Sequence, residues 1–321
     1  MAEALLDLRD VGVTFAGRHG GVRAVDGVSL DVRRGEVVAL VGESGCGKTT
    51  LIRSILGLER ASQGSITFEG TPTGHDQRSL RGLRRNVQMI FQDPSGALNP
   101  RHTIYEAVAE GIRIHKIQGD ERELVADALA QAGLRPPAQF MGRYPHEISG
   151  GQRQRVLIAG AIALGPKLLL ADEPVASLDA SIRGEILALL RSLVDEHGLS
   201  VIAVTHDLGL AWNIADRIAV LYLGRIVELG GAEDVLASPQ HPYTRALLSV
   251  VPEMERMEQQ ILTGETPDPS RIPSGCRFHP RCPVVASGEA ERLGVLSRCT
   301  GVDVDLVERG AAHWSACHAL P

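Results

Sequence analysis

The chain has 321 residues, enough for one large α/β domain with an attachment or for two smaller domains. Its 44% apolar and 22% charged residues, with 35 glycines and 17 prolines, are globular values that exclude a collagen-like, coiled-coil or wholly disordered chain. A net charge of −6 argues against a protein that binds nucleic acid, for which a basic balance is expected.

No apolar run approaches the roughly 18 residues that a membrane-spanning helix needs. The N-terminal residues 1–8 include acidic side chains where a signal peptide carries basic ones. We therefore expect a cytosolic protein that reaches a membrane only through its partners.

Short strands joined by turns are expected in residues 3–35, because apolar residues alternate within 6–15 and within 28–32. Residues 36–41 form a nearly continuous apolar run, which is typical of a strand buried on both faces of a sheet. After a glycine-rich turn, the apolar residues from Leu51 to Leu56 recur at helical spacing and predict a helix.

Two later apolar runs, at 167–171 and 200–205, flank a helix predicted from about 181 to 196. Strand, helix and strand in this order indicate parallel pairing with a right-handed crossover. Residues from about 97 to 165 lack a strong strand signal and contain helical stretches at 103–115 and 121–132. We expect this region to be a helical insertion into the α/β core.

The turn after the strand at 36–41 carries the motif G-x-x-x-x-G-K-T, from Gly42 to Thr49. Between a strand and a helix, this motif is typical of a phosphate-binding loop. The glycines let backbone N–H groups surround phosphate oxygens, and the helix N-terminus adds a partial positive charge. Lys48 is expected to reach the β- and γ-phosphates and Thr49 to ligate Mg²⁺. The alternative, a structural glycine-rich turn, does not account for the lysine and threonine.

A pair of carboxylates, Asp172 and Glu173, follows the strand predicted at 167–171. Asp172 is expected to hold Mg²⁺ and its hydration shell, and Glu173 to polarise the attacking water. Acidic residues at a strand end are common, so this interpretation depends on the phosphate loop upstream.

The segment Ser149-Gly150-Gly151-Gln152 opens another predicted helix. Ser149 can act as its N-cap. Two glycines at a helix start weaken it by up to about 1 kcal/mol each. Their presence is explained if a phosphate must approach the backbone closely.

Together these motifs resemble the ABC transporter ATPases, in which Ser-Gly-Gly-Gln belongs to the signature motif. In that family the signature binds ATP held by the other subunit of a head-to-tail dimer. The resemblance implies an α/β fold with a P-loop (RecA-like) core, an N-terminal antiparallel β-subdomain and an inserted α-helical subdomain. It divides the chain into an ABC ATPase domain at 1–251, with the helical subdomain at about 97–165, and a cysteine-containing C-terminal extension at 252–321.

The resemblance also implies a role for each matching residue. Glu173, His206, Lys48 and Gln92 would be catalytic, and Thr49, Gln92 and Asp172 would hold Mg²⁺. The residues that would contact ATP are Phe15, Gly42, Glu43, Ser44, Gly45, Cys46, Gly47, Lys48, Thr49, Thr50, Ser149, Gly150, Gly151, Gln152 and Asp179. Taken singly, Gln92 would be a turn residue, His206 a surface or core residue, and Phe15 a core residue; their common order in the chain favours the ATPase.

Three strings, at 98–101, 145–152 and 241–248, resemble the dipeptide and oligopeptide importers within this family. The resemblance implies the ATP-hydrolysing subunit of a peptide importer, peripheral at the cytoplasmic face of the cell membrane. Its partners would be a second ABC ATPase subunit, in a hetero- or homodimer, and two membrane permease subunits. Through the permeases it would act with an extracytoplasmic peptide-binding protein. Nucleic acid is not expected as a partner. The alternatives are an importer of another solute, such as a nickel chelate, and a soluble ABC protein of DNA repair or translation.

Four of the five cysteines lie in the final 46 residues, and we call them the tail cysteines. They are Cys276, Cys282, Cys299 and Cys317. Lasting disulfides are rare in the cytosol, so the clustering indicates metal. Residues 273–283 resemble the C-terminal segment of peptide-transporter ATPases, some of which hold a [4Fe–4S] cluster, and the tail cysteines would be its ligands.

Zinc and free thiols are the alternatives, and the wide gaps between the tail cysteines fit zinc poorly. Related proteins place the third cysteine closer to the second, so Cys299 is the weakest ligand candidate. His279, His313 and His318 are candidate substitutes. A tail that senses redox state and gates transport is a further hypothesis. Cys46 is expected to serve as a small residue of the phosphate loop.

Overall fold

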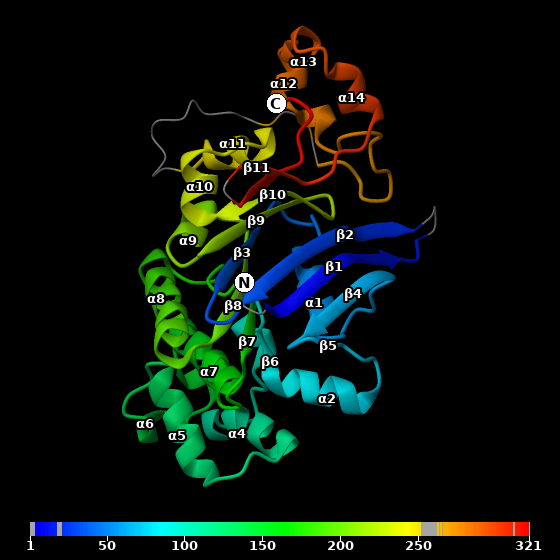
Figure 1. Ribbon diagram of the computed structural model, residues 1–321. Coiled ribbons are helices and arrows are strands. Elements are labelled where there is room, and N and C mark those ends of the chain that lie inside the picture. The colour runs from blue at the N-terminus through cyan, green and yellow to red at the C-terminus, as the bar shows by residue number, and fades with distance from the viewer. Residues whose placement is uncertain are drawn as a thin grey trace. The chain divides into compact units, whose positions relative to one another are not determined.

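The computed structural model describes residues 4–17, 21–251, 262, 264, 266–310 and 312–320 (Figure 1). These residues form two units. The first unit combines the described residues up to Leu6 with Val32–Val37 and Phe68–Val204, and the second combines Asp7–Asp31, Val38–Thr67 and the chain from Thr205 onward. The expected start of the C-terminal extension, at residue 252, lies outside the described residues.

A parallel sheet in the order β8-β7-β6 lies in the first unit. All five residues of β7 (Leu168–Asp172) are buried, because neighbours cover the strand on both faces. It pairs with β6 (Val87–Ile90) and β8 (Ser200–Thr205), and the crossover between β7 and β8 contains α8 (Ala180–His197). The predicted parallel strands and the helix between them are confirmed.

The segment between β6 and β7 is helical, and its helices cluster together in Figure 1. It contains α3 (Pro94–Ala97), α4 (Ile104–His115), α5 (Glu121–Gln131), α6 (Ala138–Met141), the 3-10 turn η1 (Pro145–Glu147) and α7 (Gly150–Ile162). α4 and α5 both pack on α7. Thr103 and Asp120 fix the starts of α4 and α5, since their side chains accept backbone hydrogen bonds as N-caps. Both predicted helices therefore begin and end within a residue of the expected positions.

Strand β1 (Ala4–Phe15) is one strand of twelve residues, where the sequence predicts short strands and turns. The apolar alternation changes from even to odd positions at Asp10, which has a positive φ of 49°. A local irregularity of this kind shifts the alternation by one residue without ending the strand. β2 (Val22–Arg33), β1 and β4 (Gln63–Phe68) lie next to one another in this order. The short β5 (Thr71–Pro72) and α2 (Gln77–Asn86), for which the sequence made no prediction, belong to the first unit.

The larger sheet of the second unit has the strand order β11-β12-β10-β9-β3. β3 (Val37–Val41) and β9 (Arg217–Tyr222) are parallel, and the pairs β9/β10 and β10/β12 are antiparallel. The remaining elements are α1 (Lys48–Ile55), α9 (Leu208–Trp212), β10 (Arg225–Gly231), α10 (Ala232–Ala237), α11 (Pro242–Leu248), η3 (His279–Arg281), α12 (Pro283–Ala286), α13 (Glu289–Arg292), α14 (Leu296–Gly301), β11 (Val307–Gly310) and β12 (His313–Ser315). β12 joins the C-terminal extension to this sheet, since Ser315 lies opposite Glu228.

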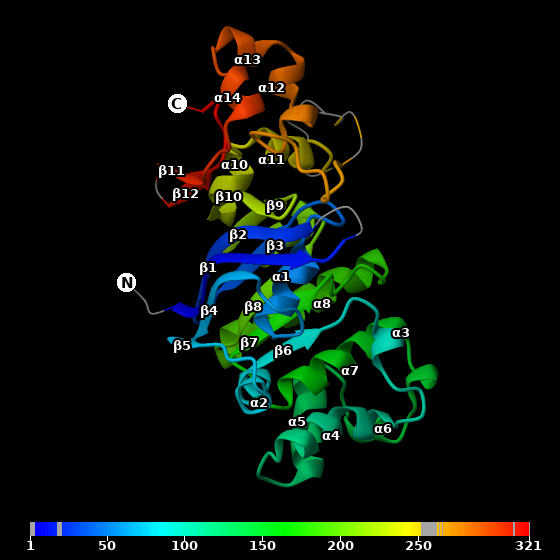
Figure 2. The ribbon, with the colours of Figure 1, turned by 90° about the vertical axis from the view of Figure 1, so that its right-hand side faces the viewer.

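Three aromatic rings anchor the extension in the core of the second unit. Phe278 of the extension is 1% exposed and lies 5.2 Å from the ring of Tyr222 and 5.3 Å from that of Tyr243. Tyr222 and Tyr243 are themselves 4.7 Å apart. The helices α12, α13 and α14 follow Phe278 and lie beside one another in both ribbon views (Figures 1 and 2). Within the described parts of the chain, no helix has the length and apolarity to span a membrane.

Candidate functional site

The phosphate loop, Gly42–Thr49, connects the buried strand β3 to α1 in the second unit. A Cβ atom on Gly42 would lie 2.2 Å from the Leu221 carbonyl oxygen, and one on Gly47 would lie 2.1 Å from that of Ala24. Gly47 is also the N-cap of α1, with a φ of 110°. Any side chain at these two positions would collide with backbone, so the loop requires glycine there.

Lys48 is 5% exposed and turns back into the loop. Its Nζ donates hydrogen bonds to the carbonyl oxygens of Gly42 (2.5 Å) and Glu43 (2.9 Å). Cys46 is buried, and burial raises the pKa of its thiol, although the Lys48 ammonium opposes the shift. The loop therefore encloses a positive charge that an anion could approach at the N-terminus of α1. Of the other loop residues, Ser44 and Gly45 are exposed, and Thr49 and Thr50 are half-buried.

The carboxylate pair lies in the first unit, at the end of β7. Asp172 is 4% exposed, and the next residue, Glu173, has a positive φ of 45°. The Glu173 N–H donates to the carbonyl oxygen of Val204 (3.0 Å). Gln92, which follows the neighbouring strand β6, donates from Nε2 to Oε2 of Glu173 (3.1 Å). Adjacent parallel strands thus bring together two of the predicted catalytic residues.

The signature segment opens α7 in the same unit, and its side chains cap the helix. The Ser149 hydroxyl accepts from the Gln152 N–H (3.2 Å), and Gln152 Oε1 accepts from the Ser149 N–H (3.0 Å). This reciprocal pair is a capping box. Gly150 begins the helix, and a Cβ on Gly151 would lie 2.8 Å from Cγ2 of Ile182. Ser149 is exposed, so the cap leaves this helix N-terminus open to solvent.

Three other predicted residues are exposed. Phe15 ends β1 and is 38% exposed, so it is not the core residue that its type alone would suggest. His206 follows β8 and belongs to the second unit. Asp179 is the N-cap of α8 in the first unit, without a hydrogen bond from its side chain to the helix.

The four tail cysteines line one small cavity in the second unit, which we call the cysteine cavity. Its volume is about 10 Å³, room for about one water molecule. Burial raises the pKa of the Cys276 thiol to about 12, with a further contribution from the three other tail cysteines. Cys299 is the ligand candidate with the least favourable spacing. It is 8% exposed, and its carbonyl oxygen accepts a hydrogen bond from the Cys276 N–H (2.9 Å).

The three candidate substitute histidines occupy different positions. His279 and His318 line the cysteine cavity, where a ring nitrogen of each lies 2.9 Å from a backbone carbonyl oxygen. Nε2 of His313 lies 2.8 Å from the buried carboxylate of Glu228 instead. Among the described residues, no group of three His, Cys, Asp or Glu side chains is arranged to hold a single metal ion.

Contacts of the phosphate loop with the extension and with Tyr243 of α11 were not predicted from the sequence. Arg281, one residue before Cys282, forms two hydrogen bonds with the Glu43 carboxylate, at 2.7 and 3.0 Å. Thr266 donates to the same carboxylate (2.8 Å), and the Glu43 N–H donates to the Tyr243 hydroxyl (2.9 Å). These partners are more than 190 positions apart in sequence from Glu43, so no local pattern could indicate the contacts.

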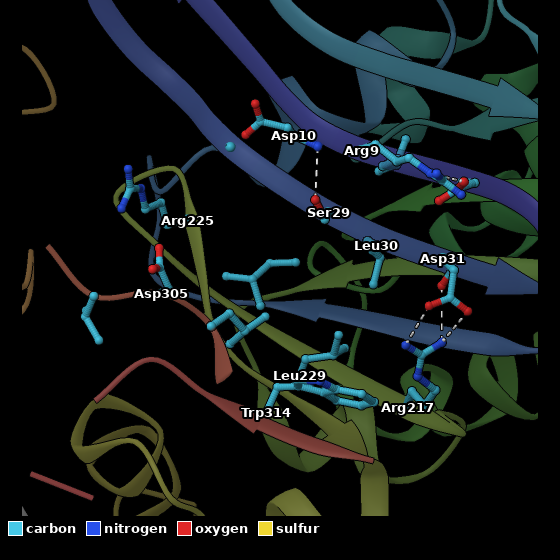
Figure 3. A pocket seen from close by; sticks show the side chains of 16 residues that line it. Arg9, Asp10, Ser29, Leu30, Asp31, Arg217, Arg225, Leu229, Asp305 and Trp314 are labelled. Carbon is cyan, nitrogen blue, oxygen red and sulfur yellow. Dashed lines mark hydrogen bonds and ion pairs between the residues drawn. The ribbon is translucent and has the colours of Figure 1, made fainter. Parts of the chain in front are cut away.

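A pocket of about 620 Å³ in the second unit is lined by β1, β2, β9, β10 and the extension (Figure 3). The phosphate loop, all of which is described, contributes none of its lining. Arg217 and Asp31 in its wall pair with each other (3.1 Å), and Arg225 pairs with Asp303 (2.6 Å). Because these charges are already compensated, the pocket is not a convincing site for a triphosphate.

Comparisons with known proteins identify the family. A model described as ABC transporter matches residues 25–176, and one described as Oligopeptide/dipeptide transporter, C-terminal region, matches residues 227–288. The oligopeptide transport ATP-binding protein AppF of Bacillus subtilis is 40% identical over 332 residues, covering 98% of this chain and 97% of the relative. The chain belongs to the ABC transporter family. The oligopeptide transport ATP-binding protein OppF of Escherichia coli is 44% identical over 312 residues, covering 92% of this chain and 93% of the relative.

Solved structures of family members agree with the fold. The cbiO1 protein of Clostridium perfringens, part of the ABC transporter complex cbiONQ, is 30% identical with a TM-score of 0.66, covering 74% of this chain and 92% of its own. A dimeric ATP-binding cassette bound to ADP and phosphate is 30% identical with a TM-score of 0.64, covering 71% of this chain and 98% of its own. The family and the P-loop α/β fold expected from the sequence are confirmed, and the chain is an ABC ATPase.

Proposed function

We propose that the chain is the ATP-hydrolysing subunit of an importer of dipeptides or oligopeptides and works at the cytoplasmic face of the cell membrane. The observation that carries the substrate class is the match of residues 227–288 to the C-terminal region of oligopeptide and dipeptide transporters. The names of AppF and OppF, which describe oligopeptide transport, support the same class.

In this proposal the phosphate loop holds the triphosphate of ATP. The backbone N–H groups at the start of α1 and the Lys48 ammonium supply the positive charge. Thr49, Asp172 and Gln92 would hold Mg²⁺, which neutralises phosphate charge when bound. Glu173 orients or deprotonates the attacking water. Its hydrogen bond from Gln92 supports a role for these two side chains in one reaction centre.

The proposed assembly is a head-to-tail pair of ATPase subunits, either two copies of this chain or this chain with a relative. Ser149, Gly150 and Gly151 of one subunit would cap the γ-phosphate bound by the other. The exposed N-terminus of α7 supports this role, because a helix N-terminus favours an anion. Two permease subunits and an extracytoplasmic peptide-binding protein complete the importer.

Uptake by intact cells tests the substrate class. A strain lacking this chain is complemented with the wild-type protein or with Glu173→Gln, and uptake of a radiolabelled tripeptide and of nickel is measured. We expect the wild-type protein alone to restore peptide uptake. Restored nickel uptake without an effect on peptide uptake would contradict the proposal and favour the related-solute alternative.

We also propose that the tail cysteines bind a [4Fe–4S] cluster. Four thiolates are the donor set that such a cluster takes, and all four line one buried cavity. The tail cysteines would bind the cluster as thiolates, so binding would release their protons.

Iron and sulfide analysis with visible absorption of the anaerobically purified protein tests the cluster. We expect iron and acid-labile sulfide in equal amounts, and their loss in Cys282→Ser. The matched control is Cys46→Ser, which removes the cysteine of the phosphate loop and should leave the iron content unchanged. Colourless, iron-free wild-type protein would contradict the proposal, and bound zinc would favour the zinc alternative.

A further inference from the structure

Glu43 is an acidic residue inside the phosphate loop, only five positions before Lys48. An ionised carboxylate there opposes the function of the loop in two ways. It repels a bound triphosphate, and it can compete with the phosphates for the Lys48 ammonium. The loop needs a device that compensates this charge.

The extension supplies such a device. Nη1 and Nη2 of Arg281 donate to the two carboxylate oxygens of Glu43, at 2.7 and 3.0 Å, in the two-pronged geometry that makes arginine–carboxylate pairs strong. The Thr266 hydroxyl donates to Oε2 (2.8 Å). The side chain of Arg281 is 7% exposed and that of Glu43 is 26% exposed, so the pair is partly shielded from water. Burial alone would raise the pKa of Glu43, yet these hydrogen bonds hold it below its ordinary value.

The position of Arg281 is fixed by its neighbours in the chain. Phe278, three residues earlier, packs in the aromatic core against Tyr222 and Tyr243. Cys282, the next residue, lines the cysteine cavity. Tyr243 belongs to the same core and accepts a hydrogen bond from the Glu43 N–H (2.9 Å). The extension and its core thus hold Glu43 by both its side chain and its backbone.

We infer that Arg281 is a positioning residue of the nucleotide site: it neutralises Glu43 and keeps this carboxylate away from Lys48, so that Lys48 and the loop amides remain available to a triphosphate. The inference rests on the proposed binding of ATP by the phosphate loop. It gives the C-terminal extension a direct part in nucleotide binding.

The test is a double-mutant cycle on the purified full-length chain, with affinity measured by titration of a fluorescent ATP analogue. Arg281→Gln should weaken binding about tenfold, which corresponds to 1.4 kcal/mol. Glu43→Gln should bind more tightly than the wild-type protein, because it removes the carboxylate that repels the triphosphate. Combining both substitutions should restore affinity to within about threefold of Glu43→Gln. In ATPase assays, Arg281→Gln should raise KM by the same factor and leave kcat at saturating ATP within about threefold.

The matched control is Arg292→Gln, which removes an exposed arginine from α13 of the same extension and should bind the analogue like the wild-type protein. If Arg281→Gln does not fold, the cycle is run with Arg281→Lys, which keeps the charge but loses the two-pronged geometry. This variant should lose less affinity for the ATP analogue, and Glu43→Gln should again restore the affinity.

Unchanged affinity in Arg281→Gln would overturn the inference. So would a double variant as weak as Arg281→Gln, because that result indicates a purely structural arginine. A wild-type chain that does not bind the analogue would instead contradict the proposed function.

Discussion

His241→Asn should flatten the pH dependence of unfolding of the second unit. His241 is 1% exposed and is the N-cap of α11, where its Nδ1 accepts from the Tyr243 N–H (3.0 Å). Burial lowers its pKa from 6.5 to about 4, although the Glu228 carboxylate and the Ala316 backbone favour the charged form. Asparagine is a good N-cap that does not titrate, so this substitution keeps the cap and removes the proton.

The sign and size of the effect follow from proton binding. Below a pH of about 6.5 the unfolded chain takes up a proton at this histidine, whereas the folded chain does so only near pH 4. The stability that neutral His241 contributes is therefore complete above pH 6.5 and is lost as the pH falls toward 4. Between pH 7.5 and 5.0 these two pKa values give a loss of about 2 kcal/mol.

Urea unfolding at the two pH values measures this loss. Both tryptophans of the chain, Trp212 and Trp314, belong to the second unit, so their fluorescence reports on its unfolding. The quantity to compare is the change in unfolding free energy between pH 7.5 and 5.0, which does not depend on the absolute stability of each variant. The control is His146→Asn, which removes an exposed histidine. A pH-dependent loss in His241→Asn equal to that of the wild-type protein would refute the reasoning.

Three further predictions concern the candidate site. Glu173→Gln should keep ATP binding and nearly abolish phosphate release, since it removes the carboxylate that acts on the water; normal turnover would contradict this role. Ser149→Asp should preserve the N-cap and the melting temperature but lower ATPase activity, because a carboxylate would face the phosphate; full activity would limit Ser149 to capping. Gly151→Ala should lower stability in thermal melts, because its Cβ would lie 2.8 Å from Cγ2 of Ile182 and the overpacking cost of about 1–3 kcal/mol outweighs the gain in helix propensity. In a chain that already carries Ile182→Ala, Gly151→Ala should cost much less, and an equal cost would point to backbone strain.

The parts of the fold that the sequence predicts well are those determined locally. The run at 37–41 is apolar throughout, as expected for a strand buried on both faces, and the phosphate-loop motif follows it directly in the sequence. The starts of α4 and α5 are set by caps adjacent in sequence. The full length of β1 does not follow from the sequence, because one residue of positive φ, Asp10, changes which positions are buried.

The contacts of the extension could not be predicted, because they join residues far apart in the chain. Arg281 and Tyr243 lie in segments that resemble the peptide-importer family. The neighbouring sequence does not show that either residue forms a hydrogen bond with Glu43. The spacing of the tail cysteines also does not show that the chain returns through α12–α14 to bring the Cys299 carbonyl oxygen to the Cys276 N–H. The domain boundaries, the roles of the site residues and the cysteine ligands remain predictions.

The pairing of β12 with β10 has a consequence for biosynthesis. Residues 313–315 follow the other strands of the larger sheet of the second unit in the chain, yet they pair with β10, and His313 reaches the buried Glu228 carboxylate. Until these residues have emerged from the ribosome, β10 has an unpaired edge and Glu228 lacks one of its partners. The nascent second unit therefore exposes an edge strand open to aggregation until β12 is in place.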